Sequence, residues 1–286
     1  DIPVWSGPEP IWEAAREKQH YLRDLEKVID YIYAGDIFQA NMARTFTAEK
    51  PPGFDPYLHY CHLRQRNPAP FGAYLNMAGT VLASSSPERF LKTDFDGHVM
   101  TCPIKGTAKR HQDAQTDEKI RNNLEHSIKD RAENTMIVDL LRNDLAKTCQ
   151  DESINVDKLC VLESFEGLHH LVSTITGRLR PDCTALDCMR GCFPGGSITG
   201  APKIRAMEII EELEPVRRGP YCGSIAYIGF DGAMDSSILI RTLIYYGDRI
   251  RLSAGGGIVA DSDPETEFEE TETKASKVLE SFATAQ

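Results

Sequence analysis

The segment FGAYLNMAGTVLAS, residues 71–84, decides the fold, because the pattern of the chain changes there from helix to strand. Residues 71–77 and 80–84 are short strand-like stretches joined by Ala78-Gly79, a pair typical of a turn. Two strands joined by such a short turn must run antiparallel. The segment therefore predicts a β-hairpin and, with it, an antiparallel sheet.

Further hairpins and helices alternate on both sides of this segment. Strands are predicted over residues 90–93, 98–104, 158–164, 168–179, 221–230, 237–246 and 250–253. Helical spacing of apolar residues predicts helices over 13–34, 55–65, 116–146, 184–192, 202–213 and 264–282. Hairpin groups separated by helices indicate an α+β fold, with antiparallel sheets packed against outer helices.

Composition limits the class of protein. The chain has 286 residues, 41% hydrophobic and 26% charged, as expected for one large globular domain or two merged ones. The net charge of −11 argues against nucleic acid as a partner, and no apolar run is long enough for a membrane span. The eight cysteines are scattered without a C-x-x-C pair, which favours reduced thiols in a cytoplasmic protein.

The pentapeptide PIKGT, residues 103–107, places Lys105 at a predicted tight loop behind a short apolar stretch. A lysine is normally a solvated surface charge. At a buried turn, however, it can lose its proton and become an amine nucleophile. Proline and glycine mark turns in many proteins, so the pentapeptide alone is not specific. Other motifs in the chain are needed to support a function for Lys105.

Two acidic groups are candidate metal ligands. Glu267, Glu270 and Lys274 share one face of the last predicted helix, and two carboxylates on one turn suit a hard cation such as Mg²⁺. Taken alone, a solvated charged face is the simpler interpretation. Glu133 lies near the buried side of an earlier helix, where a carboxylate needs either a metal or a salt bridge to a neighbour such as Arg131 or Arg142.

Two glycine-rich stretches, residues 194–203 and 254–258, are candidate anion sites, because glycines let a ligand approach backbone N–H groups. For residues 194–203 the alternative is an ordinary glycine-rich connection. Glu88 follows a proline at a strand end, where it is either a general acid or the N-terminal residue of a helix. Arg241, within the predicted strand 237–246, is a carboxylate clamp or a rim charge, and His170 is an acid–base group or a structural histidine.

Six ordered blocks resemble the chorismate-utilising enzymes, and the likeness runs from about residue 20 to the C-terminus. They are SSSPERFL (84–91), PIKGT (103–107), KDRAENTMIVDLLRNDL (129–145), PGGSITGAPK (194–203), AYIGF (226–230) and GGGIVADSDPETEFEET (255–271). The resemblance implies that family's fold for residues 20–286, as one catalytic domain. Residues 1–19 are then expected to be a linker or arm, and the family's N-terminal region is expected to be missing.

The resemblance also implies roles for particular residues. Lys105, Glu88 and His170 match the catalytic positions of the family, with Glu88 as the acid that protonates a departing hydroxyl. Glu133 and Glu270 match its Mg²⁺ ligands, with Glu267 beside them. The positions that hold the carboxylates of the substrate are matched by Thr199, Gly200, Tyr227, Arg241, Gly255, Gly256, Gly257 and Lys274.

Within the family, the lysine of PIKGT resembles the aminodeoxychorismate synthases, whereas anthranilate synthases typically carry alanine there. The likeness implies amination of chorismate at C4, in the route to 4-aminobenzoate and folate. No glutaminase signature is present, so ammonia is expected from a separate glutamine amidotransferase subunit or from solution. The alternatives are an anthranilate synthase component I and a catalytically silent chorismate-binding subunit.

Overall fold

The computed structural model describes residues 7–165 and 167–283, and the fold is α+β with antiparallel sheets, as predicted. Within these residues the strands form two sheets of seven strands each. The chain divides into two compact units, and each contains one of the sheets. The first unit comprises the chain up to Pro87, Ile198–Ile225 and the chain from Ile238; the second comprises Glu88–Ser197 and Ala226–Ser237. The start of the predicted arm, residues 1–6, lies outside the described residues.

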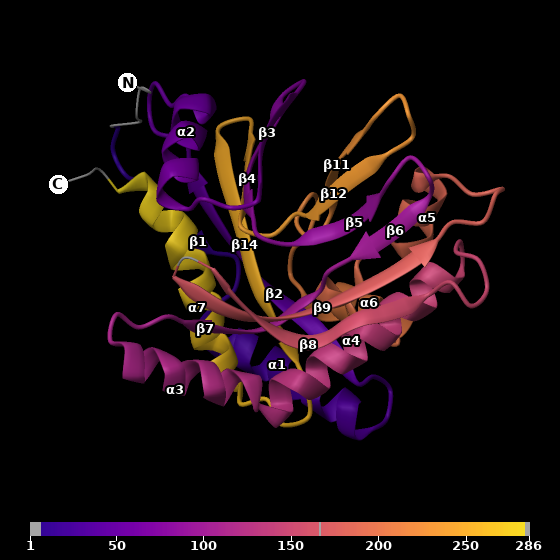
Figure 1. Ribbon diagram of the computed structural model, residues 1–286. Helices are drawn as coiled ribbons and strands as arrows, with labels where there is room; N and C mark the ends of the chain where they lie inside the picture. Colours follow the sequence, from indigo (N-terminus) through magenta and orange to yellow (C-terminus); the bar gives the residue numbers. More distant parts are fainter. Residues whose placement is uncertain (1–6, 166, 284–286) are drawn as a thin grey trace. The chain divides into compact units, whose positions relative to one another are not determined.

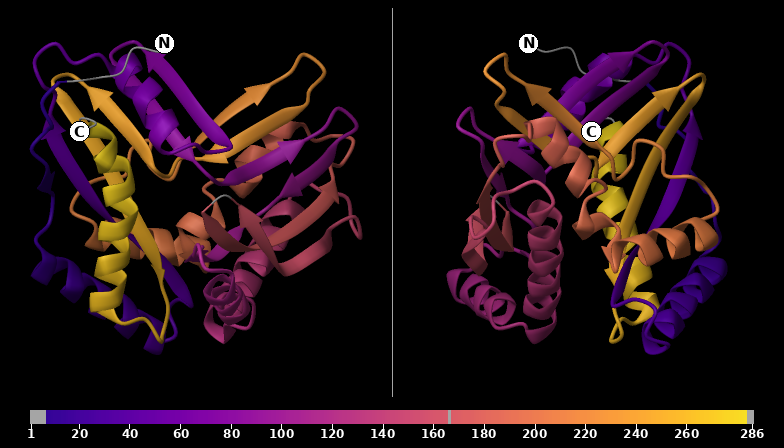
Figure 2. Two further views of the ribbon diagram at one scale, coloured as in Figure 1. Left: turned by 60° about the vertical axis from the view of Figure 1, so that its left-hand side comes forward. Right: turned by 90° about the vertical axis from the view of Figure 1, so that its right-hand side faces the viewer.

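The sheet of the first unit contains the hairpin predicted over 71–84. Its strand order is β1 (Glu13–Ala14), β2 (Gln39–Glu49), β14 (Arg249–Ile258), β13 (Thr242–Tyr246), β4 (Thr80–Ser86) and β3 (Phe71–Met77), and β10 (Gly200–Ala201) also pairs with β2. The helices of this unit are α1 (Lys18–Tyr33), α2 (Pro56–Arg66), α6 (Lys203–Leu213) and α7 (Pro264–Leu279), followed by the 3-10 turn Glu280–Phe282. Figure 2 shows α7 lying along β14.

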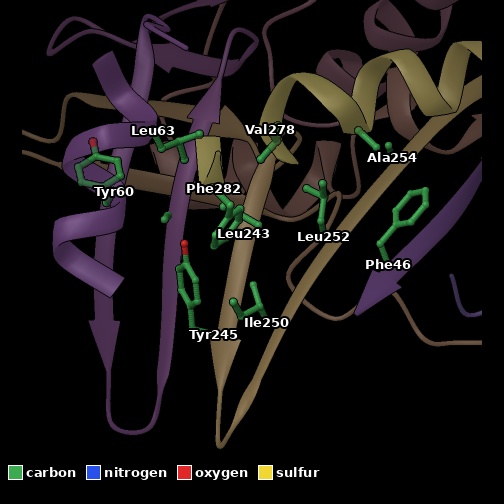
Figure 3. Close-up of a cluster of buried hydrophobic side chains, with 12 residues drawn as sticks. Phe46, Tyr60, Leu63, Leu243, Tyr245, Ile250, Leu252, Ala254, Val278 and Phe282 are labelled. Atoms are coloured by element: carbon green, nitrogen blue, oxygen red, sulfur yellow. The ribbon is translucent and has the colours of Figure 1, made fainter. Parts of the chain in front are cut away.

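A buried apolar cluster fixes α7 and α2 to this sheet (Figure 3). Leu243 and Leu252 lie opposite each other on β13 and β14, and Ala275 and Val278 of α7 pack into the same cluster. Phe282, just after α7, is also buried there. Burying an aliphatic or aromatic side chain contributes roughly 1.5–3 kcal/mol, so this cluster anchors the helix that carries the predicted acidic residues.

His59 of α2 is a buried, uncharged part of the same region. Its Nδ1 lies 2.8 Å from the Tyr245 hydroxyl and its Nε2 lies 3.1 Å from the Ser281 hydroxyl. The ring stacks on Phe282 with centroids 3.8 Å apart. Burial, reinforced by the neighbouring His62, lowers the pKa of His59 from 6.5 to about 3.

This shift predicts a loss of stability in acid. Above pH 6.5 His59 is neutral in both states, but between pH 6.5 and 3 only the unfolded chain takes up the proton. The free energy of unfolding should therefore fall by about 1.4 kcal/mol per pH unit from this residue. Urea unfolding at pH 7 and pH 5 measures this change. Between the two pH values, the free energy of unfolding should fall by about 2 kcal/mol less in His59→Gln than in the parent. Equal losses in parent and variant would show that His59 is protonated in the folded protein.

The second unit is built on the other sheet. Its strand order is β11 (Ser224–Ile228), β12 (Met234–Ile238), β5 (Arg89–Thr93), β6 (His98–Thr101), β9 (Leu168–Arg178) and β7 (Ile104–Lys109), and β8 (Asn155–Phe165) also pairs with β9. The helices are α3 (Ala114–Glu125), α4 (Ile128–Ala146) and α5 (Ala185–Cys192), and the 3-10 turn η1 spans Gly196–Ile198. Figure 1 shows α3 and α4 lying along the hairpin of β8 and β9.

Several predicted boundaries were wrong. The helix predicted over 116–146 is broken, because the Ser127 hydroxyl accepts from the Asp130 N–H and starts a new helix, α4. The strand predicted over 237–246 is broken at Arg241, whose φ is +50°. The helix predicted from residue 13 begins at Lys18, because Glu13–Ala14 pairs with β2. Among the described residues, no helix combines the length and apolarity needed to cross a membrane.

Candidate active site

Lys105 lies in strand β7 and not in the predicted loop. The pairing of β7 with β9 shifts at this point: Lys105 is opposite Leu171 and Thr107 is opposite His170, which leaves Gly106 as a bulge. Gly106 has φ +80°, a left-handed conformation that glycine adopts without strain. The bulge is therefore the local feature that sets the direction of the Lys105 side chain.

Glu133 of α4 is the acidic neighbour of Lys105. The Lys105 Nζ and the Glu133 Oε2 are 3.9 Å apart, and the two side chains are only 13% and 14% exposed. A salt bridge to a basic neighbour was the alternative to a metal for Glu133, and a basic neighbour in the structure is Lys105. Arg131 donates to backbone carbonyls and Arg142 pairs with Asp139.

Replacing Gly106 by alanine tests this geometry. A Cβ at Gly106 would lie 3.0 Å from the Asp130 Cβ and 3.1 Å from its carboxyl group. Gly97 has the same φ, and its nearest atom would be 3.7 Å away. Measured by urea unfolding, Gly97→Ala should lower the free energy of unfolding by about 1–2 kcal/mol through backbone strain. Gly106→Ala should lower it by about 1–3 kcal/mol more, because Asp130 must move. Equal losses would show that Asp130 has room to accommodate the methyl group.

His170 of β9 lies beside the same motif. Its Nδ1 is 2.8 Å from the Thr107 hydroxyl. The neighbouring His169 has different partners: its Nδ1 is 2.7 Å from the Ser164 hydroxyl and its Nε2 is 3.2 Å from Asp117. Both histidines lie opposite residues of β7, and the side chain of His170 contacts PIKGT through Thr107.

Glu88 lies between β4 and β5 in the sequence and is buried, with 7% of its surface exposed. The Ser197 hydroxyl of η1 donates a hydrogen bond of 2.9 Å to its Oε1. Nothing in the sequence pattern pointed to Ser197, which comes from the glycine-rich stretch 194–203. A buried carboxyl held by an oriented donor can hold a proton for transfer.

The acidic face predicted on the last helix is present in α7 of the first unit. Glu267 is buried and accepts a hydrogen bond of 2.7 Å from Ser262. Glu270 forms an ion pair with Lys274, whose Nζ also donates to the Gly255 carbonyl at 2.9 Å. Both carboxylates approach Gly256: a Cβ there would lie 3.2 Å from the Glu267 Oε2 and 3.8 Å from the Glu270 Oε1.

This pair of carboxylates fits the chemistry of a Mg²⁺ site. Mg²⁺ prefers oxygen ligands, usually binds one or two carboxylates and keeps several waters. Gly256 leaves room beside Glu267 and Glu270 that any side chain would fill. Among the described residues, no three His, Cys, Asp or Glu side chains lie close enough together to hold a metal ion. The third predicted ligand, Glu133, belongs to the second unit.

The prediction that the strand ends before residue 254 was wrong. Gly255, Gly256 and Gly257 continue strand β14 and pair with Ala43, Met42 and Asn41 of β2. A Cβ at Gly255 would lie 2.4 Å from the Met42 carbonyl oxygen, so the two strands approach too closely for a side chain. These glycines are required for strand packing, and Gly256 also gives room to the two carboxylates.

The remaining predicted substrate residues are distributed over both units. In the first unit, Thr199 and Gly200 lie against β2, and Arg241 sits at the break between β12 and β13. In the second unit, Tyr227 of β11 is 73% exposed. Their predicted role in holding carboxylates remains a prediction.

The sequence matches the family described as chorismate binding enzyme over residues 5–280. The chain belongs to the chorismate binding enzyme family. It is 47% identical to aminodeoxychorismate synthase component 1 of Escherichia coli over 268 residues, which cover 94% of this chain and 58% of that protein. It is 42% identical to anthranilate synthase component 1 of Bacillus subtilis over 270 residues, which cover 94% of this chain and 52% of that protein.

A solved structure of a chorismate binding enzyme agrees with the fold. Anthranilate synthase component I of Streptococcus pneumoniae superimposes with a TM-score of 0.86 at 34% identity, covering 98% of this chain and 61% of that one. The chain thus spans between half and two thirds of the length of these relatives.

Proposed function

We propose that the chain is a component I aminodeoxychorismate synthase, which replaces the C4 hydroxyl of chorismate by an amine. Lys105 carries this proposal. It is a lysine of low exposure, set by a glycine bulge and accompanied by Glu133, at the position where anthranilate synthases typically have alanine. Greater identity to an aminodeoxychorismate synthase than to an anthranilate synthase, 47% against 42%, supports it.

In the proposed reaction the free amine of Lys105 attacks C2 of chorismate. The new bond to nitrogen shifts both conjugated double bonds of the ring, and the C4–O bond breaks. Glu88, oriented by Ser197, donates the proton with which the hydroxyl leaves as water. Ammonia then forms a bond to C4, the bond between Lys105 and C2 breaks, and the lysine is released as an amine.

Further residues are assigned to binding. We propose that Thr199, Gly200, Tyr227, Arg241, Lys274 and the Gly255–Gly257 strand hold the two carboxylates of chorismate, and that His170 assists proton movement beside Thr107. Glu133, Glu267 and Glu270 are the proposed Mg²⁺ ligands. Bound Mg²⁺ would offset the negative charge of the substrate in this acidic protein.

Ammonia is proposed to come from a glutamine amidotransferase subunit. The name "component 1" of the bacterial relatives indicates a second component in those proteins. The proposed compartment is the cytoplasm, where the eight free cysteines would stay reduced.

A product assay separates this proposal from its main alternative, anthranilate synthase, since the chain is 42% identical to the Bacillus subtilis component 1 of that enzyme. The purified chain is mixed with chorismate, Mg²⁺ and ammonium at alkaline pH, and products are separated by liquid chromatography with mass detection. The proposal predicts a product that carries an amine in place of the C4 hydroxyl, without release of pyruvate. Anthranilate with pyruvate would refute it, and absence of turnover would favour a silent chorismate-binding subunit.

A further inference from the structure

Arg218, which follows α6 in the first unit, is a buried cation with an unusually complete set of partners. Its Nε and Nη2 donate to the two carboxylate oxygens of Glu214 at 2.9 and 2.6 Å. Its Nη1 donates to the Ile198 carbonyl at 2.8 Å, and its Nη2 also donates to the Asn41 carbonyl. The two charged side chains are only 15% and 6% exposed.

The two carbonyls that Arg218 joins belong to segments that already pair with each other. The Asn41 N–H donates to the Thr199 carbonyl at 2.8 Å, and the Phe38 N–H donates to the Ala201 carbonyl at 2.7 Å. Between them, a Cβ at Gly200 would lie 2.1 Å from the Gln39 carbonyl oxygen. The guanidinium of Arg218 therefore bridges the start of the 198–201 segment to β2, next to its backbone pairing.

Glu214 completes this arrangement. Besides the two bonds from Arg218, its Oε1 accepts the backbone N–H of Ala43 at 2.9 Å. A buried ion pair is tolerated when further hydrogen bonds satisfy its charges, as they do here. Burial opposes the charge of Arg218, but the hydrogen bonds and charge of Glu214 outweigh it and hold the pKa of Arg218 above its ordinary value.

We propose that Arg218 is a positioning residue for chorismate binding: it holds Thr199 and Gly200 in place by joining Ile198 and Asn41. This inference rests on the proposed function, in which Thr199 and Gly200 hold a carboxylate of the substrate. Three directions of donation are needed at once, to Glu214, Ile198 and Asn41. The planar fork of arginine provides them, whereas the compact ammonium of lysine cannot span the same three partners.

Arg217 offers a matched control one residue away. Its side chain is 90% exposed, and its Nε lies 3.5 Å from Glu211, a weak surface contact. Substituting lysine at each of the two positions keeps the net charge of the chain. Only the substitution at Arg218 removes the bridge between Ile198 and Asn41.

The test compares Arg218→Lys with Arg217→Lys in steady-state consumption of chorismate. Arg218→Lys should raise KM for chorismate about tenfold or more with a smaller change in kcat, because misplaced binding groups weaken substrate positioning. Amide hydrogen exchange at Asn41, whose N–H donates to Thr199, should speed up by about tenfold, with little change in the rest of the sheet. Arg217→Lys should behave as the parent in both measurements.

A KM within twofold of the parent, in a folded Arg218→Lys variant, would overturn the proposal. If that variant does not fold, Glu214→Gln, which removes the charge that orients Arg218, should still raise KM and the exchange rate of Asn41, and unchanged values would overturn the proposal. The assay measures the disappearance of chorismate, whichever product forms. A parent that makes anthranilate would therefore refute the proposed function but not the role of Arg218. If the parent consumes no chorismate, exchange at Asn41, measured without substrate, still decides whether Arg218 holds the segment.

Discussion

Replacing Lys105 by alanine should reduce amination of chorismate at C4 by about 10³-fold or more, the scale of loss seen when a covalent nucleophile is removed. The physical reason is that no other amine is assigned to form the bond to C2. We expect the fold to survive. The Lys105 Nζ and the Glu133 Oε2 are 3.9 Å apart, which is too far for a strong ion pair. The measurement is the rate of formation of the aminated product with ammonium as nitrogen source.

Lys109 provides the control for this experiment. It lies in the same strand, β7, and is exposed. Lys109→Ala should keep the activity of the parent. If Lys105→Ala makes the aminated product at an undiminished rate, the nucleophile role of Lys105 is refuted.

Replacing Glu267 by glutamine should weaken Mg²⁺ binding by at least tenfold and lower activity by about 10²-fold, since even groups that only support a metal ligand cost 10- to 100-fold when changed. Glu267 is buried beside Gly256, and Ser262 fixes one of its oxygens. The amide keeps the shape and the hydrogen bond from Ser262 in one orientation, but it loses the charge. Calorimetric titration with Mg²⁺ measures the affinity independently of turnover.

Glu269, on the exposed side of the same helix, is the matched control. Glu269→Gln removes the same charge from α7 and should leave the affinity for Mg²⁺ unchanged. Equal weakening in both variants would show a general effect of helix charge, and no weakening in Glu267→Gln would remove Glu267 from the ligand set.

The parts of the fold with local signals were predictable from the sequence. The 71–84 hairpin and the helix starting near residue 202 follow from turn residues and apolar spacing. Strand β2 was missed, because it is buried on both faces and carries Gln39, Asn41 and Arg44 in its interior, so it lacks the alternation that marks a strand. The extension of β14 was missed because three glycines usually end a strand, whereas here they allow close approach to β2.

In the candidate site, too, only the features with a local sequence signal were predictable. Glu267 and Glu270 share a face of the helix because they are at positions i and i+3, so the sequence alone predicts that they are neighbours. The partnership of Lys105 with Glu133, and that of Glu88 with Ser197, join separate elements of the second unit and leave no local pattern. The bulge at Gly106 had only the glycine itself as a signal, and that signal favoured a loop over a strand.

The most direct test of the central claim is to look for the covalent bond at Lys105. The chain is incubated with chorismate and Mg²⁺ without ammonium, quenched and digested, and the peptides are measured by mass spectrometry. The account predicts a peptide containing Lys105 that has gained chorismate less one water, and its loss when ammonium is added before quenching. An adduct on another residue, or formation of the C4-aminated product by a chain in which Lys105 is never modified, would contradict it.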